Sequence, residues 1–187
     1  MEKTYSFYDI TKSYIKFTES VNSYSIDCMG SLSIKPNTKT LTKKCGNRVI
    51  KKVVKGDGTA AGTLKIYMPR KMYCDIFGLN ISGLVTGVKA YGTESTHGHF
   101  SFTAIATDED GKKCFIALPD AVITSAPDID VENGKEEIEE IELTLESFSD
   151  DRGLCLYEAM ADEVLPTITE DKWLKSFTPD MVRSATA

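Results

Sequence analysis

Apolar and polar residues alternate along several short segments of this chain. The alternation is clearest at residues 100–107 and 114–118, which an Asp-Glu-Asp-Gly turn at 108–111 separates. Because successive side chains of a strand point to opposite faces, this pattern predicts two half-buried strands joined in a hairpin. Further strands are predicted at residues 25–35, 64–68, 84–91, 128–132 and 141–148.

The segment at 141–148 carries conflicting signals. Its glutamates favour a helix by intrinsic propensity. Its strict period of two from Glu140 onward, and the Asn133-Gly134 turn before it, favour a strand. The period decides for a strand, with Glu140, Glu142 and Glu146 on one of its faces.

One short helix is predicted between Pro69 and Gly78, where four apolar residues recur at helical spacing. Proline suits the first turn of a helix, and glycine suits its C-terminal end. Residues 154–164 and 170–182 hold too few periodic positions to distinguish strand from helix, and 165–187 is expected to be a docking tail. Strands with tight turns and a lone helix predict a mainly β fold, a β-sandwich or barrel with one short flanking helix.

Residues 36–62 depart from this pattern. They are rich in lysine and threonine, contain only short apolar pairs, and end in a glycine-rich stretch that begins with Gly56-Asp57-Gly58. Between residues 35 and 55 there are eight basic residues and no acidic one. This composition predicts a long mobile excursion or a loose hairpin, ordered by a partner because it contributes little to a core.

Composition places the chain among ordinary globular proteins. Its 187 residues fit a single domain, 1–187, and its hydrophobic fraction of 41% and charged fraction of 27% allow a substantial core. No stretch approaches the roughly 18 apolar residues of a membrane span, and the N-terminus lacks an export signal, so a cytoplasmic protein is expected. The five scattered cysteines form no Cys-x-x-Cys pair and are expected to be reduced thiols, mostly in the core.

Charge is distributed unevenly along the chain. The net charge of −6 argues against a surface that binds phosphate groups. The basic segment 35–55 contrasts with the acidic segment 128–151, whose only basic residue is Lys135. The paired carboxylates of the acidic segment are expected to form a solvated face, because a catalytic pair needs one carboxyl in an apolar pocket.

Candidate catalytic and metal-binding residues are few. His97 and His99 are the only histidines, two ligands do not make a metal site, and exposed rings in a turn are expected. Cys45 stands among basic residues, but a cysteine nucleophile needs a positioned base, which no local pattern supplies. The glycines form no phosphate-binding loop. The sequence therefore assigns no catalytic residue, cofactor or metal, and the chain is expected not to be an enzyme.

Several short phrases of the sequence occur in an informative order. Along the chain they are a Ser-rich strand at 31–35, the long loop, Gly-Thr-Leu-Lys-Ile at 62–66, the short helix with Gly-Leu-Asn at 78–80, the hairpin turn at 108–112, Pro-Asp at 119–120, and Asp-Asp-Arg-Gly at 150–153 after the late strand. Over residues 25–160 this layout resembles the major tail proteins, or tail tube proteins, of bacteriophages with long non-contractile tails.

The resemblance implies a β-sandwich subunit that assembles into hexameric rings, stacked into a tube through which the genome passes without specific binding. It also implies contacts with the tape-measure and other tail proteins, within a virion tail assembled in the host bacterial cytoplasm. The loop 36–62, and the chain ends 1–15 and 165–187, are expected to reach neighbouring subunits. The candidate contact residues of the loop are Lys43, Lys44, Arg48, Lys51 and Lys52.

A tube that conducts DNA should repel phosphates, which carboxylates do and lysines do not. Glu140, Glu142 and Glu146 are therefore the candidate lumen-facing residues, and the alternative is that their face meets solvent outside the tube. The basic loop and the acidic strand are complementary surfaces that could set the direction of stacking. Two other functions stay open: a tail terminator or baseplate-proximal ring protein, and a small-ligand-binding β-barrel.

Overall fold

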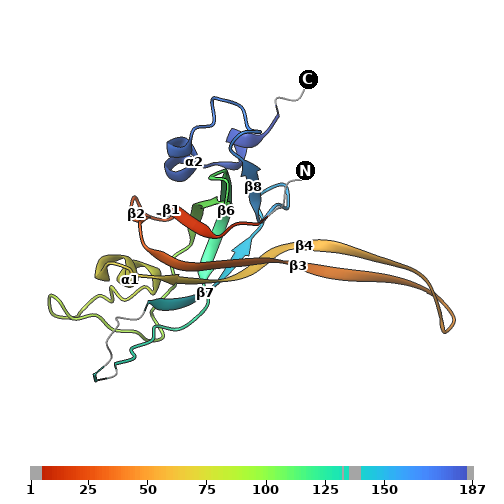
Figure 1. Ribbon diagram of the computed structural model, residues 1–187. Helices are drawn as coiled ribbons and strands as arrows, with labels where there is room; N and C mark the ends of the chain where they lie inside the picture. The colour runs from red at the N-terminus through yellow and green to blue at the C-terminus, as the bar shows by residue number, and fades with distance from the viewer. Residues whose placement is uncertain (1–5, 132, 135–139, 185–187) are drawn as a thin grey trace.

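The strands of this protein form one sheet (Figure 1). The computed structural model describes residues 6–131, 133–134 and 140–184. Within them eight strands pair in the order β2-β1-β5-β6-β7-β4-β3, with β8 paired to β6. The elements are β1 (Asp9–Phe17), β2 (Ser23–Ile26), β3 (Met29–Cys45), β4 (Arg48–Ile66), α1 (Arg70–Ile76), β5 (Phe100–Thr107), β6 (Lys113–Ile123), β7 (Ile141–Phe148), β8 (Tyr157–Met160), α2 (Glu170–Ser176) and the 3-10 helix η1 (Pro179–Val182).

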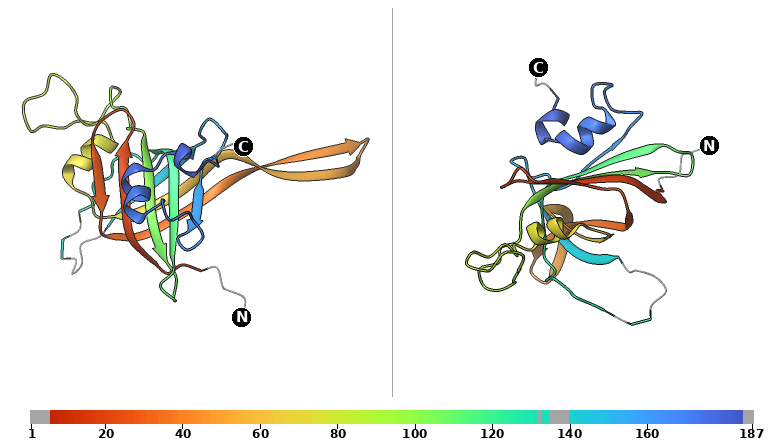
Figure 2. Two further views of the ribbon diagram at one scale, coloured as in Figure 1. Left: turned by 90° about the horizontal axis from the view of Figure 1, so that it is seen from above. Right: turned by 90° about the vertical axis from the view of Figure 1, so that its left-hand side faces the viewer.

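The sheet curls so that its two ends enclose one core. β1 contacts β3 across this core, and the right panel of Figure 2 shows the two resulting layers. Alternate residues of the strands fill the space between them, including Ile15, Phe102, Leu64 and Leu143. Antiparallel strands that bury every second side chain confirm the predicted mainly β fold.

Helix α1 covers part of the same core. Its Met72 and Ile76 are fully buried, and it begins directly after Pro69. Gly78 follows the helix in the left-handed region, with φ at 61°, and a Cβ there would lie 2.2 Å from the carbonyl oxygen of Thr96. The predicted short helix is confirmed, and glycine is required at its C-terminal end.

Helix α2 lies on the opposite face of β5 and β6 and creates a second hydrophobic cluster. Its Trp173 and Leu174 pack against Ile105 and Phe115, and Trp173 Nε1 donates a hydrogen bond to the carbonyl oxygen of Ile116 at 3.1 Å. The sequence left this segment open between strand and helix. It docks on the chain's own sheet as far as Val182, and residues 185–187 lie outside the described residues.

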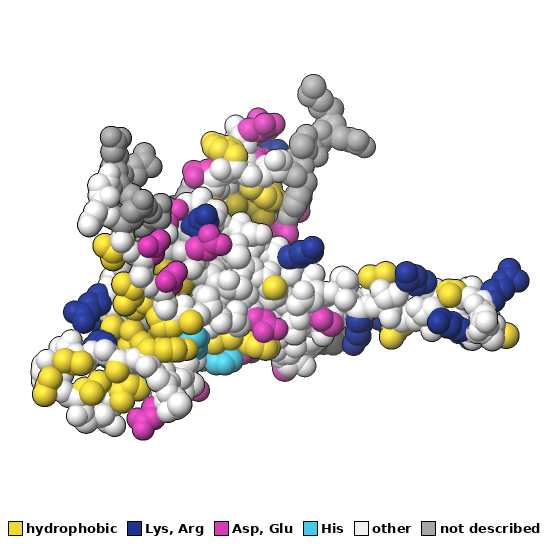
Figure 3. Space-filling model, turned by 90° about the horizontal axis from the view of Figure 1, so that it is seen from below, with side chains coloured by type: hydrophobic (Ala, Val, Ile, Leu, Met, Phe, Trp, Pro, Cys, Tyr) yellow, Lys and Arg dark blue, Asp and Glu magenta, His cyan; other side chains and the backbone are white. Residues whose placement is uncertain are grey.

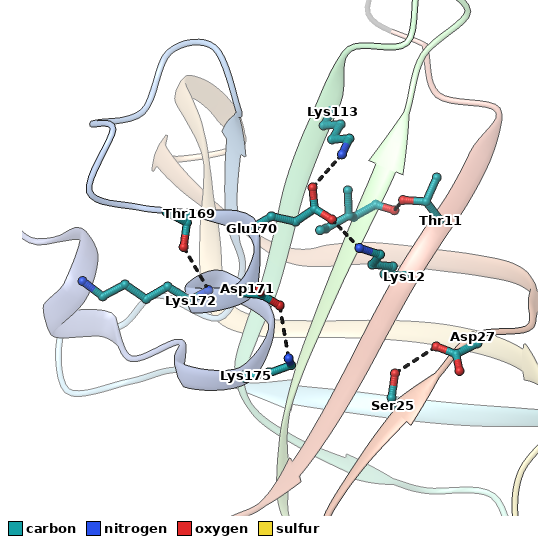
Figure 4. Close-up of polar contacts among 11 residues, drawn as sticks. Thr11, Lys12, Ser25, Asp27, Lys113, Thr169, Glu170, Asp171, Lys172 and Lys175 are labelled. Carbon is teal, nitrogen blue, oxygen red and sulfur yellow. Dashed lines mark hydrogen bonds and ion pairs between the residues drawn. The ribbon is translucent and has the colours of Figure 1, made fainter.

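Glu170 ties α2 to two strands (Figure 4). Its carboxylate accepts hydrogen bonds from Lys12 Nζ of β1 at 2.7 Å and from Lys113 Nζ of β6 at 2.6 Å. These contacts, that of Lys113 first, hold the pKa of Glu170 below its ordinary value. Thr169 caps the helix, because its Oγ1 accepts a hydrogen bond from the Lys172 amide at 3.4 Å. One carboxylate thus holds the helix across β1 and β6.

The N-terminal strand was not indicated by the sequence pattern. β1 lies between β2 and β5, and its Ile15 and Phe17 are buried. Residues 9–15, which were expected to reach a neighbouring subunit, instead pair within the chain's own sheet. Residues 1–5 lie outside the described residues.

Two predicted strands are wrong. Residues 84–91 form turns and coil, because Gly83 and Gly87 adopt positive φ angles of 84° and 89° that no strand continues through. Residues 128–131 pair with no other strand, and Glu132 lies outside the described residues. The structure also adds α2 and η1 to the single helix that was predicted.

The contacts of Glu170 give a testable dependence on pH. A carboxylate whose pKa is lowered by folding stabilises the protein above its unfolded pKa, and this contribution is lost as pH falls through the folded pKa. We expect Glu170→Gln to lower the Tm by about 2–4 °C at pH 7 and to lower it less at pH 3.5. Thermal unfolding followed by circular dichroism measures both values. Asp171→Asn is the matched control, because the Asp171 side chain is 82% exposed and forms its salt bridge with Lys175 of the same helix. Equal effects of Glu170→Gln at both pH values would contradict the assignment.

Candidate assembly surfaces

The hairpin of β3 and β4 extends far beyond the sheet (Figures 1 and 2). β4 pairs with β7 only from Ala60 to Ile66, and among the described residues 38–55 the two strands pair with each other alone. We call residues 38–55 the arm. At about 3.4 Å per residue, the arm carries its tip about 24 Å beyond its base. The segment 36–62, expected as a mobile excursion or loose hairpin, is a long paired hairpin whose register shifts at two places, between Pro36 and Thr38 and between Lys43 and Lys44.

A bulge in β4 marks the base of the arm. Pro36 pairs with Ala60 and Thr38 with Gly56, so three residues of β4 stand opposite one residue of β3. The Asp57 carboxylate accepts hydrogen bonds from the amide and the hydroxyl of Thr59, both at 2.9 Å, which lower the pKa of Asp57. Because bulges increase strand twist and bend the strand, this one fixes the direction in which the arm leaves the body. The Gly-Asp-Gly sequence therefore builds a bulge within a strand.

The register of the arm places like charges opposite each other. Lys39 pairs with Lys55 and Lys43 pairs with Lys51, while Leu41 pairs with Val53 between them on the same face. Directly opposed side chains of an antiparallel pair stand about 5 Å apart at Cβ, and like charges at that position destabilise the pairing. The arm therefore contains repulsion that an acidic partner would relieve.

Apart from the half-buried Val53, the residues of the arm are exposed to solvent. Leu41, Ile50 and Val54 are 51%, 59% and 62% exposed, and none of the residues 38–55 belongs to either hydrophobic cluster. A hairpin of two strands with no packed face is marginally stable in water. The five predicted contact residues all lie on the exposed arm: Lys43, Lys44, Arg48, Lys51 and Lys52. Their contact with a neighbouring subunit stays a prediction.

The three candidate lumen residues lie on the outer side of the β4–β7 layer, but in different settings. Glu142 is 58% exposed and forms a salt bridge of 3.1 Å with Lys65. Glu146 is half-buried, and the Glu140 carboxylate lies so close to Gly30 that a Cβ there would collide with it. Their exposure to a lumen stays a prediction. The neighbouring glutamates at 136, 137 and 139 lie outside the described residues.

An acidic groove of about 770 Å³ lies at the end of β4 that is remote from the arm. It brings together side chains from α1, from residues 128–130 and from the start of β7. Figure 3 shows acidic side chains on the body and lysine and arginine side chains along the arm. The described lining residues, which we call the acidic groove, are Lys65, Tyr73, Asp128, Ile129, Asp130, Glu140, Ile141 and Glu142.

The two histidines have structural partners. His97 Nδ1 lies 2.5 Å from the carbonyl oxygen of Ile123, and the ring packs edge-on against Phe77. His99 Nδ1 lies 2.9 Å from a carboxylate oxygen of Asp120. The rings were expected to be exposed in a turn. The His99 side chain is 43% exposed, but both residues are half-buried overall, because their side chains link the segment before β5 to β6. Within residues 6–131, 133–134 and 140–184, no three metal-ligating side chains are grouped.

Comparison with known proteins adds little evidence about function to that of the surfaces described above. No protein-family model matches the chain, and no curated protein matches its sequence. Its chain trace is similar to one in the cryo-EM structure of the anti-feeding prophage (AFP) baseplate, 6-fold symmetrised. The TM-score is 0.45 and the sequence identity 11%, over 85% of this chain and 97% of that chain. The function proposed below therefore rests on the arm and on the sequence resemblance.

The cysteines allow a direct test of the exposed arm. Cys45 at the tip of the arm and Cys28 are exposed, whereas Cys74, Cys114 and Cys155 are buried. We expect two thiols of the native, unassembled chain to react rapidly with a maleimide, and all five to react after unfolding in guanidinium. Cys45→Ser should remove one of the two rapid reactions, and Cys74→Ser, the matched control, should remove none. A native chain in which Cys45 is unreactive would contradict the exposure of the tip.

Proposed function

We propose that this chain is a structural subunit that polymerises as stacked hexameric rings into a bacteriophage tail tube, the conduit for genome passage. The observation that carries the proposal is the arm, a hairpin that leaves the body and packs against none of its own core. The resemblance of the sequence to tail tube proteins adds the kind of assembly. Under this proposal the partners are further copies of the chain, the tape-measure protein and other tail proteins.

The physics of the arm supports a role in assembly. Leu41, Ile50 and Val54 of the arm remain in water, and its lysines stand opposite one another. The arm therefore adds little to the folding free energy of the isolated subunit. A neighbouring subunit that buried the apolar side chains and opposed the lysines with carboxylates would remove both costs. An arm of this kind is therefore best explained by a contact made between subunits.

A head-to-tail contact joins unlike patches of neighbouring copies, so it needs two different surfaces on one subunit. The basic arm and the acidic groove are one such pair of surfaces, since they lie at opposite ends of β4. The net charge of −6 agrees with a conduit to which DNA does not adhere. The proposal gives the chain no catalytic role.

A tail terminator or baseplate-proximal ring protein would use similar contacts but would stop at a single ring. The second alternative, a small-ligand-binding barrel, has one observation in its favour. An apolar cavity of about 470 Å³ opens between the N-terminal segment, β3 and β6, lined by Ile10, Leu32, Ile34 and Leu156 among others. A cavity of this size and polarity is able to hold a small apolar molecule.

Negative-stain electron microscopy of the purified chain tests the proposed function. We expect the wild-type chain to form extended tubes, and a variant with residues 38–55 replaced by Asn-Gly to form none. The deletion removes no core residue, so its Tm should stay within about 4 °C of the wild type. Single rings without tubes would favour the terminator alternative, and tubes of the deleted variant would contradict the role of the arm.

A thermal-shift series tests the ligand-binding alternative. A ligand that binds only the folded state raises the Tm, and the rise grows with the logarithm of its concentration relative to its dissociation constant. Under the proposed function we expect medium-chain fatty acids and alcohols, as apolar probes of the cavity, to raise the Tm by less than about 1 °C at millimolar concentration. A larger shift that Leu32→Trp abolishes, while the surface control Lys89→Ala retains it, would favour the ligand-binding barrel.

A further inference from the structure

We propose that the arm of one copy of this chain docks in the acidic groove of a second copy. The inference rests on the proposed function and adds to it the surface that receives the arm. The arm carries seven basic side chains and no acidic one. The described lining of the groove offers four carboxylates, of Asp128, Asp130, Glu140 and Glu142, and one basic side chain, Lys65.

The two surfaces match in more than charge. Between its lysine pairs the arm presents Leu41 and Val53, directly opposed on one face. The groove presents Tyr73, Ile129 and Ile141 among its carboxylates, and Ile129 is 86% exposed. Burying these apolar groups against one another, with lysines meeting carboxylates around them, gives the apolar centre and polar rim of a protein interface.

The positions of the two surfaces require that the contact be made between copies. The groove lies where Lys65 pairs with Glu142 and Ile66 with Ile141, at one end of the β4–β7 ladder. The arm begins beyond Ala60 and Ser147, at the other end of the same ladder, and extends away from the body (Figure 3). The arm of a chain therefore points away from its own groove, and docking joins copies head to tail. Head-to-tail contacts that repeat from copy to copy produce rings or filaments.

The acidic groove fits the arm better than the apolar cavity does. Asp9 and Glu158 are the carboxylates among the mostly apolar side chains that line the cavity. The cavity therefore offers less negative charge than the groove to the opposed lysine pairs Lys39–Lys55 and Lys43–Lys51. Docking of the arm in the groove would cover Glu140 and Glu142. For these two residues it excludes the lumen assignment, whereas Glu146 lies outside the groove lining.

A charge-swap experiment tests the docking. The arm variant is Lys43→Glu with Lys51→Glu, and the groove variant is Asp128→Lys with Asp130→Lys, all at exposed positions. We expect each variant alone to raise the critical concentration for tube formation by at least about tenfold, because like charges then face each other. The chain that carries all four substitutions should regain most of its assembly. Sedimentation and electron microscopy measure the polymer, and circular dichroism confirms that each variant is folded.

The control reverses charge outside the groove. Asp162→Lys with Glu163→Lys makes the same change of net charge at exposed positions before α2, and it should leave the critical concentration unchanged. Two results would overturn the docking while leaving the proposed function intact, provided that the wild-type chain forms tubes. One is normal assembly of the groove variant, and the other is no recovery of assembly in the chain with all four substitutions.

A gel-shift assay with duplex DNA at 150 mM NaCl tests whether nucleic acid, rather than a second copy, binds the arm. Binding that the arm variant loses, with assembly unaffected, would also overturn the docking.

Discussion

Strand β4 is the element on which the rest of the structure depends, because it belongs to both the body and the arm. In the body it pairs with β7 on one side and β3 on the other, and buries Leu64 and Ile66 in the core. Beyond the bulge the same strand continues into the arm with only β3 beside it. The free energy gained in the core thus anchors the arm through a continuous backbone. A hairpin that would be marginal alone gains a fixed base and a fixed direction from the body.

The sequence pattern predicted the strands in which apolar and polar residues alternate and missed those in which they do not. Strands β5, β6 and β7 were predicted, although α2 also covers the second face of β5 and β6, where Ile105 and Phe115 lie. In β1 the core face carries the polar Ser13 beside Ile15, and the outward Tyr14 packs beneath α2, so the alternation in residue type is weak. In the arm both faces meet solvent, so lysines and threonines occupy either side. Periodicity reports a difference in residue type between two faces, and it fails where polar residues occupy both faces, as they do in the arm.

The candidate surfaces were predictable in part for a similar reason. A run of lysines is visible in the sequence, so the basic arm was expected. The groove combines Tyr73 of α1 with Ile129 and with the start of β7, and nothing local links positions more than fifty residues apart. The partners of His97 and His99 depend likewise on how β6 lies beside the segment that precedes β5. Composition predicts a charged segment of the chain, but only the fold brings distant side chains to one surface.

The lysines of the arm serve two purposes that need not conflict. β3 is an edge strand of the sheet, and an open edge is able to pair with another exposed strand. Lysines along an edge oppose such pairing, because two like-charged edges repel each other. In the docking proposed above the same lysines attract the acidic groove, so the charge that opposes pairing between free arms would also select the contact between arm and groove. Specificity of this kind depends on salt, since exposed charges are screened within about 8 Å at physiological ionic strength. In the proposed contact, burial of the opposed pair Leu41 and Val53 would stabilise the two surfaces once their charges have aligned them.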